Sequence, residues 1–547
     1  MDEDTDTEAI LGVIVLRNMK FKITIDNVIG GISPSLYRGK AGQFNTSIGI
    51  DPDKPQQSGS TIKTSGVLMP SAYTDFTGAA LTGYAKWITT NPHDSNIYVY
   101  ASDGEFLSYN SAFGSETDIG TPTSGIGNGM AYYNNFIYLA TPTDISRYGP
   151  LDNSPSLANT FWTSTLSLAA LGNPTYPTQR QVLLPNHPMH VHNDNKLYIG
   201  DFETSTSSAN EGRGKISYIR TNSGTDEGDT NDGSAENVFF LPPSYAPVDI
   251  ESWGTDLVIA AIPMSTVGIN NTIAQGKAKL FFWDAVNAPS LPYRVVDLPD
   301  PTCTALLNHN GNLFIWSGNM NNGVRVSRYL GGYKTEQLAF FEEGFSPPAG
   351  AVEGLGNRVV WGAFTTYPEN SACVYSLGYK DANLPLALHN IVNTDAAASS
   401  TQGMVTAIRY AQHASFIDPR FIVGWRDNTN FGIDQLSSTA NVAVWRSLLY
   451  AVGAPFRINK VTIPLTTAVA SNHTLIPTLF VDDENTSTAL TTINSTNYAN
   501  SERRIVYHPN VQGNNNFDLQ LRWSGTSIIG VSMPIIIEGE TLTDATG

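Results

Sequence analysis

The chain has 547 residues, and 31 Lys and Arg against 49 Asp and Glu give a formal net charge of −18. A surface of that sign repels nucleic-acid phosphates and anionic lipid, so we expect no direct nucleic-acid binding. Charged residues make up only 15% of the chain. That fraction lies below the roughly 25% of typical soluble domains. No apolar run approaches the ~20 residues of a membrane span.

Residues 1–75 form the first region, which is rich in Gly and Pro and poor in periodicity. The acidic start MDEDTDTEA does not fit a secretory signal, so we expect folding in a cytoplasm. Irregular stretches such as GGISP predict an extended N-terminal arm that lies over another surface.

Residues 76–440 carry a repeated motif, in which an apolar β-rich triplet follows a polar turn and ends on a small residue. The copies begin at Ile97, Ile137, Leu197, Leu257, Leu313, Val359 and Phe421. Repeats with spacings of roughly 40 to 60 residues are typical of propeller blades. Seven copies predict a seven-bladed β-propeller, with six or eight blades as alternatives. The small residues after each triplet suit a crowded strand end.

Residues 441–547 lack this motif and contain several short strands. The segment from Phe456 to Ile463 alternates between apolar and polar residues, as a half-buried strand does. The segment from Val442 to Tyr450 fits both a helix and a strand, and we predict a strand because Val and Trp crowd a helix. About 105 residues of short strands predict a C-terminal β-sandwich. The whole chain is therefore expected to be all-β.

Three aspartates in the longest polar loop, TNSGTDEGDTNDGSAE, are the candidate metal ligands. Asp226, Asp229 and Asp232 offer closely spaced carboxylates followed by glycine, which could hold Ca²⁺. Their spacing is not that of an EF-hand, and a solvated acidic loop is the alternative. No other cofactor is indicated. His187, His190 and His192 form a histidine cluster, and His190 and His192 share one strand face. These two could be metal ligands, and the alternative is that the histidines have local structural roles.

Catalytic motifs are weak in this sequence. Ser102-Asp103-Gly104 approaches the Asp-box turn of sialidases but lacks its Thr-Trp continuation. Asp249 and Glu353 are inner-strand carboxylates without the spacing that would mark a glycosidase pair. Cys303 and Cys373 are expected to be buried thiols. Four loop tyrosines could contact sugars or partners, or simply pack between blades: Tyr245, Tyr293, Tyr333 and Tyr367.

Segments at both ends of the chain carry a resemblance to a known class of proteins. GGISPSLYRGKAGQFNTSIGIDPDKP, SGVLMP and WRSLLYAVGAPFRINKVTIPL resemble virion proteins of tailed bacteriophages. The resemblance implies a tail or tail-tip component that is present in several copies, made in the host cytoplasm and located in the virion. It supplies no functional residues.

The leading hypothesis is therefore a non-enzymatic structural component of a phage tail, acting as a nozzle, a tip or an adhesin. Its expected partners are other tail proteins, copies of itself in cyclic symmetry and, for an adhesin, a host cell-surface glycan. The alternative is a propeller glycan hydrolase with a carbohydrate-binding sandwich. A third hypothesis is an acidic interaction scaffold that binds basic partners.

Overall fold

The computed structural model of the chain describes its backbone in separate ranges. These are residues 19–28, 30–33, 42–48, 50–51, 69–70, 72–75, 81–91, 93, 96–110, 116–122, 129–141, 144–162, 187–203, 213–220, 235–265, 272–273, 276–286, 292, 294–319, 323–341, 346–365, 371–378, 387–393, 403–411, 420–427, 430–437, 442–471, 473–483, 486–524 and 529–542. Within them, no helix has the length and apolar character needed to span a membrane. Apart from the short 3-10 helix η2 (Ala349–Ala351), the elements named below are strands.

Antiparallel sheets of mostly four strands follow one another along the chain, and each is named here by its first strand. The β8 sheet contains β8 (Ala85–Thr90), β9 (Ile97–Ala101), β10 (Phe106–Tyr109) and β11 (Glu116–Gly120). The β12 sheet contains β12 (Gly129–Tyr133), β13 (Phe136–Ala140), β14 (Ile145–Gly149) and β15 (Ser156–Trp162). The β16 sheet contains β16 (Met189–Val191), β17 (Lys196–Glu203), β18 (Arg213–Arg220) and β19 (Ala235–Pro243).

The same pattern continues through the middle of the chain. The β20 sheet contains β20 (Tyr245–Trp253), β21 (Asp256–Ser265), β23 (Lys279–Trp283) and β24 (Arg294–Asp297), with β22 (Thr272–Ile273) paired to β21. The β25 sheet contains β25 (Thr302–His309), β26 (Asn312–Asn319), β27 (Gly323–Gly331) and β28 (Lys334–Phe341). The β29 sheet contains β29 (Val352–Leu355), β30 (Arg358–Thr365), β31 (Ser371–Gly378) and β32 (Ala387–Asn393).

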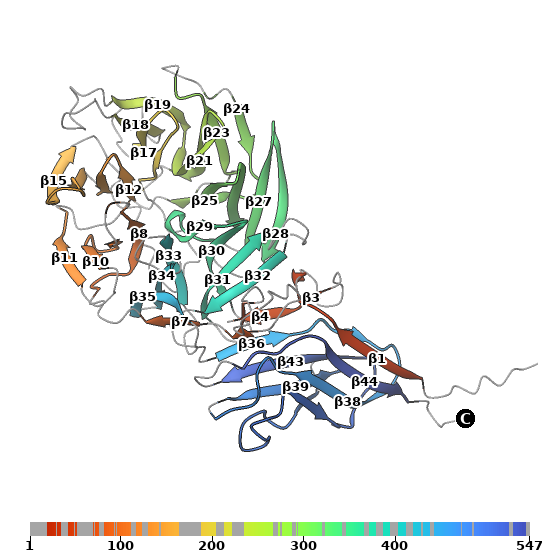
Figure 1. Ribbon diagram of the computed structural model, residues 1–547. Coiled ribbons are helices and arrows are strands. Elements are labelled where there is room, and N and C mark those ends of the chain that lie inside the picture. Colours follow the sequence, from red (N-terminus) through yellow and green to blue (C-terminus); the bar gives the residue numbers. More distant parts are fainter. Residues whose placement is uncertain are drawn as a thin grey trace, which may run out of the picture.

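The β33 sheet is completed by a strand from the N-terminal region. It contains β33 (Gly403–Ala411), β34 (Arg420–Asp427), β35 (Asn430–Ser437) and β7 (Ala72–Asp75). The first strands of consecutive sheets contact one another around a closed circle, because β33 also contacts β8. Figure 1 shows the sheets arranged around a centre. This is the arrangement of a β-propeller, and the predicted all-β class is confirmed.

The repeated triplets of the sequence are the second strands of these sheets, β9, β13, β17, β21, β26, β30 and β34. Several of the turns before them need a positive φ, as at Asn135 (φ 70°) and Asn195 (φ 59°), which Asn tolerates better than most residues. The small residues after the triplets lie in crowded places. A Cβ on Gly200 would lie 2.7 Å from Pro188 Cγ, next to β16 of the same sheet, and 3.1 Å from Pro247 Cγ in the neighbouring β20 sheet, so a larger side chain would not fit without movement of both prolines.

Two further sheets come from the C-terminal region and the start of the chain. One contains β1 (Lys20–Ile25), β44 (Ile535–Thr541), β38 (Phe456–Pro464) and β41 (Arg504–Tyr507), with β42 (Val511–Gly513) on β38. The other contains β4 (Thr46–Ile48), β36 (Val442–Arg446), β43 (Asn516–Ser524), β39 (Leu475–Val481) and β40 (Thr486–Ala489), with β37 (Tyr450–Ala451) on β43. We call them the β38 sheet and the β43 sheet. The strand predicted from Val442 to Tyr450 is confirmed in part: β36 ends at Arg446, and Tyr450 begins the separate strand β37.

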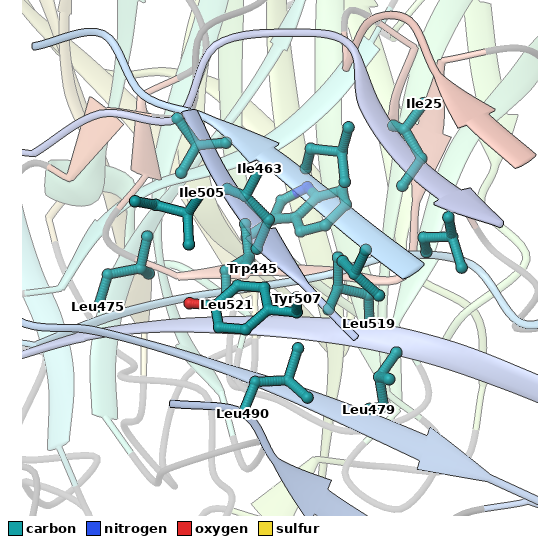
Figure 2. Packing of buried hydrophobic residues seen from close by; sticks show 14 of the residues in the cluster. Ile25, Trp445, Ile463, Leu475, Leu479, Leu490, Ile505, Tyr507, Leu519 and Leu521 are labelled. Atoms are coloured by element: carbon teal, nitrogen blue, oxygen red, sulfur yellow. The ribbon is translucent and has the colours of Figure 1, made fainter. Parts of the chain in front are cut away.

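The β38 and β43 sheets share one continuous apolar core. Ile463 and Ile505 of the β38 sheet pack with Leu479, Leu519 and other residues of the β43 sheet (Figure 2). Such a core is expected from strands in which every second residue is apolar. Ile25, from β1, belongs to the same core. The N-terminal region therefore contributes to the C-terminal sheets as well as to the ring.

Short N-terminal strands lie between these two parts of the molecule. β2 (Gly31–Ile32) pairs in parallel with β3 (Gln43–Phe44), and β5 (Ile50–Asp51) pairs with β6 (Met69–Pro70). Both β2 and β5 contact β32, and β5 also contacts β36. The region expected to form one extended arm therefore consists, where it is described, of strands distributed over several sheets.

Candidate functional site

A group of polar side chains lies on the first strands of the ring, and we call it the inner polar cluster. It contains His190, Glu251, Ser252, Asn308, Glu353 and Arg409, from β16, β20, β25, β29 and β33. These strands are neighbours around the ring, so residues far apart in the sequence meet there. The cluster is a first candidate for a functional site.

The two histidines that share a strand face converge on one hydroxyl group. His190 Nε2 lies 2.7 Å and His192 Nδ1 lies 2.8 Å from Ser252 Oγ. A serine hydroxyl has one proton to donate, so one imidazole accepts that proton and the other donates its own N–H. Burial lowers the pKa of His190 to about 4 and also lowers that of His192. Both rings are therefore neutral near pH 7.

His187 lies apart from the other two histidines. Its Nδ1 is 3.1 Å from Gly200 O and 3.7 Å from Asp201 Oδ1. The three histidines thus do not meet at one point. Among the residues that the structure describes, no group of three or more His, Cys, Asp or Glu side chains is placed to hold a metal ion. The histidine positions fit local structural roles.

Glu251 is a carboxyl group of the inner polar cluster whose acidity is strongly altered. Burial raises its pKa to about 7, and the nearby charge of Glu353 acts in the same direction. Its Oε1 accepts a 2.9 Å hydrogen bond from Ser252 N and lies 3.4 Å from His190 Nε2. Glu353 is held by Arg409, with 3.1 Å between Oε2 and Nη1. Near neutral pH, Glu251 is therefore poised between its two protonation states.

Asp249 has a structural role between neighbouring sheets. Its side chain is buried and accepts hydrogen bonds from Leu306 N at 2.6 Å and Ile250 N at 2.9 Å. Burial raises its pKa well above the usual range, although these two hydrogen bonds oppose the rise. Because β20 has a bulge between Pro247 and Asp249, this carboxylate joins β20 to β25 where the strand ladder is interrupted. It is not available to a substrate.

A second candidate is a cavity of about 360 Å³ between the β25 and β29 sheets. Its wall includes the turns that follow β25 and β29, together with residues of β26, β27, β28, β30 and β31. Its lining includes Asn310, Asn312, Phe314, Arg328, Asn357 and Leu377. A cavity of this size is at the small end of the range for small-molecule sites.

The remaining predicted residues have different outcomes. The calcium candidates Asp226, Asp229 and Asp232 lie outside the described residues, as do Tyr293 and Tyr367. Asp103 serves its own turn, accepting hydrogen bonds from Thr82 Oγ1 at 2.5 Å and Glu105 N at 3.2 Å. Tyr245 packs on Phe281, with 5.7 Å between ring centroids. Tyr333 is 74% exposed.

Sequence reasoning missed Ser252, Arg409 and the cavity residues. No pattern in the sequence links Ser252 to His190 and His192, because they lie about 60 residues earlier in the chain. The cavity residues Asn310, Asn312 and Asn357 stand in or beside the polar turns that precede two of the repeated triplets, so the sequence identified them only as turn residues. Only the contact between two sheets brings them together.

Comparisons with known proteins add little to this geometry. No protein-family model and no curated protein match the sequence. Among solved structures, the chain is similar to the Neurospora crassa Pan2 WD40 domain, with 8% identity, a TM-score of 0.39, and 66% of this chain and 94% of that chain covered. It is also similar to the Myceliophteria thermophila Cps50 (Swd1) beta-propeller domain, with 10% identity, a TM-score of 0.40, and 67% and 99% covered.

A third similar structure is Chaetomium thermophilum Raptor, with 11% identity, a TM-score of 0.39, and coverage of 65% of this chain and 28% of that chain. At these identities and TM-scores, the likeness carries no information about activity or partners. The propeller fold stated above follows from the strand order and from the closed circle of first strands.

Proposed function

We propose that the chain is a non-enzymatic structural component of a tailed-phage virion that acts through protein–protein assembly. In this proposal the ring is a seven-bladed propeller, residues 72–75 and 81–437, and the β38 and β43 sheets form a sandwich that residues 20–51 complete. The protein would be located in the tail, in several copies with cyclic symmetry, and would contact other tail proteins.

The observation that carries the proposal is the meeting of the two segments that resemble phage virion proteins. Ser47 of the N-terminal segment pairs with Trp445 of the C-terminal one, and Asn45 N donates a 3.0 Å hydrogen bond to Arg446 O. The rings of Phe44 and Trp445 are 6.2 Å apart. Because β4 also contacts β32 of the ring, the two segments lie in one part of the molecule, which supports a shared role for them.

Links between neighbouring sheets support an assembly role, because they make the ring stiff. Tyr133 Oη donates to Asn195 O at 2.7 Å, and Asn193 Nδ2 donates to Gly254 O at 2.6 Å. Asn308 Nδ2 donates to Ser252 O at 2.7 Å. Each bond joins one sheet to the next. A stiff disc is suited to holding partners at fixed positions.

The test is the mass of the purified chain in solution, measured by light scattering at several concentrations. A closed ring of copies, seen again by electron microscopy, is the expected result. A monomer at every concentration that also fails to join purified tail proteins would overturn the proposal.

A glycan hydrolase is the second candidate, and Glu251 is the observation that favours it. A carboxyl group with a pKa of about 7 beside a second carboxylate, Glu353, has the character of a general acid. Turnover of a cell-surface polysaccharide by the wild type, and its loss in Glu251→Gln, would support this candidate. Absence of turnover would exclude it for the polysaccharides tested.

A further inference from the structure

The cavity between the β25 and β29 sheets combines an apolar floor with a polar rim. Phe314 on β26 and Leu377 on β31 line the floor, and they belong to the apolar cluster that contains Trp316 and Trp361. The rim carries the side chains of Asn310, Asn312 and Asn357, which come from two neighbouring turns. A ligand in this cavity would have one apolar face and several hydrogen-bonding groups at its edge.

The rim retains hydrogen-bonding capacity that no described residue uses. Asn357 makes no side-chain hydrogen bond within the described part of the chain, and it is exposed. Asn312 donates to Asn310 O at 3.3 Å, and Asn310 donates to Gly356 O at 3.0 Å. The amide oxygens of Asn310 and Asn312 accept no hydrogen bond from the described residues. Each amide offers both donors and an acceptor, which matches hydroxyl groups.

The charge of the cavity is nearly balanced. Arg328 lies directly opposite Phe314 in the sheet, and its Nη2 is 2.6 Å from Glu336 Oε2. This ion pair leaves little net charge on Arg328 at the cavity wall. The chain as a whole carries a net charge of −18, which disfavours an anionic ligand. An uncharged ligand is the better match.

We propose that this cavity binds an uncharged pyranose sugar. The apolar face of the ring would lie on Phe314 and Leu377, as sugar C–H groups pack on aromatic and aliphatic side chains, and its hydroxyl groups would bond to the three asparagines. This inference rests on the proposed function and extends it, because it gives an assembled tail protein a glycan-binding site. All the residues of the site come from a single chain. Its test therefore does not depend on assembly.

The experiment is saturation-transfer NMR on the full chain with four neutral probes and one acidic probe. The neutral probes are the methyl pyranosides of glucose, galactose, mannose and N-acetylglucosamine, each at millimolar concentration, and the acidic probe is glucuronic acid. We expect signal from at least one neutral probe and less from glucuronic acid. No signal from any neutral probe, or signal from glucuronic acid alone, would overturn the proposal.

Variants then locate the binding. Asn357→Ala should weaken binding of the responding probe about 3- to 10-fold, the equivalent of one hydrogen bond, and Asn357→Trp should abolish it by filling the mouth of the cavity. Both changes are at an exposed turn residue, so folding should survive. Tyr333→Ser, at an exposed hairpin residue outside the cavity wall, is the matched control and should bind as the wild type does. Binding that survives Asn357→Trp would overturn the assignment to this cavity.

The two proposals fail separately. A monomer that fails to join tail proteins but binds the sugar at this cavity would contradict the assembly proposal and leave the sugar site standing. A ring of copies that gives no sugar signal would contradict the sugar site and leave the assembly proposal standing.

Discussion

The ring and the C-terminal sheets bury their apolar residues in different ways. In the ring, apolar clusters form between neighbouring sheets; one of them joins Val258 and Leu280 of the β20 sheet to Leu306 and Ile315 of the β25 sheet. The β38 and β43 sheets instead share a single continuous core. When each sheet packs only against its two neighbours, loss of one contact lowers the stability of those sheets more than that of the rest, as in other repeat architectures. The comparison predicts local damage from changes in the ring and global damage from changes in the C-terminal core.

The largest effect is expected at a buried ion pair of the β43 sheet. Arg446 and Asp518 are fully buried and form two 2.7 Å bonds. Asp518→Ala leaves the guanidinium buried without its carboxylate, which should cost about 3–5 kcal/mol of unfolding free energy. Chemical denaturation would measure the loss. Lys460→Ala, which breaks the half-exposed pair with Glu538, is the control and should cost less than about 1 kcal/mol.

A similar but local effect is expected where the N-terminal strand completes the β33 sheet. In β7, Tyr73 pairs with Leu436 and Thr74 with Gln435. Prolines at both positions remove at least one ladder donor, since N–H groups alternate in direction along an antiparallel strand. We expect a loss of about 1–3 kcal/mol and faster amide exchange in β35, with β38 unchanged. Equally fast exchange in β38 would contradict the idea of local stability in the ring.

The pH dependence of stability should reveal two opposing groups within the ring. The folded state raises the pKa of Glu251 to about 7, so its contribution is present at low pH and is lost as the pH rises from about 4.5 to 7. The folded state lowers the pKa of His190 to about 4, so its contribution is lost as the pH falls from about 6.5 to 4. Each slope is about 1.4 kcal/mol per pH unit at most. Over much of this range the two nearly cancel.

Single variants separate these two slopes. Relative to the wild type, His190→Asn should lose stability as the pH rises from about 4.5 to 7, because the slope of Glu251 is no longer opposed. Glu251→Gln should gain stability over the rise from about 4 to 6.5, through His190. Denaturation midpoints at several pH values would measure both curves. Parallel curves for the wild type and both variants would show that neither group titrates as described.

The smallest effect is expected at a single hydrogen bond between sheets. Asn308→Leu removes the bond to Ser252 O and should cost about 1 kcal/mol. Thermal unfolding and amide exchange would place the loss in β20 and β25. Tyr333→Ser, at a side chain that is 74% exposed, serves as the control and should change stability by less than about 0.5 kcal/mol. An equal shift in both variants would contradict a role for this bond.

Local patterns in the sequence predicted the second strands of the ring and the strand at β36. Triplets such as Leu197-Tyr198-Ile199 are apolar, β-branched or aromatic, and follow a turn, so three independent signals agree. The strands that pair with β1, β4 and β7 could not be predicted, because pairing between strands so far apart in the sequence produces no repeating pattern in either of them. The face shared by His190 and His192 followed from strand alternation. Their common partner Ser252 did not, since it depends on how two sheets pack.

The pairing of β1 with β44 has a consequence for synthesis on the ribosome. Met19 N donates a 3.0 Å hydrogen bond to Thr541 Oγ1, across 522 positions of sequence. At roughly 5–20 residues per second, the nascent chain carries β1 for on the order of 30–100 s before its partner emerges. An unpaired strand of this kind is a template for association with other chains. The strand contains Lys20 and Lys22. Their charges repel a second copy of the same strand and so oppose association during that interval.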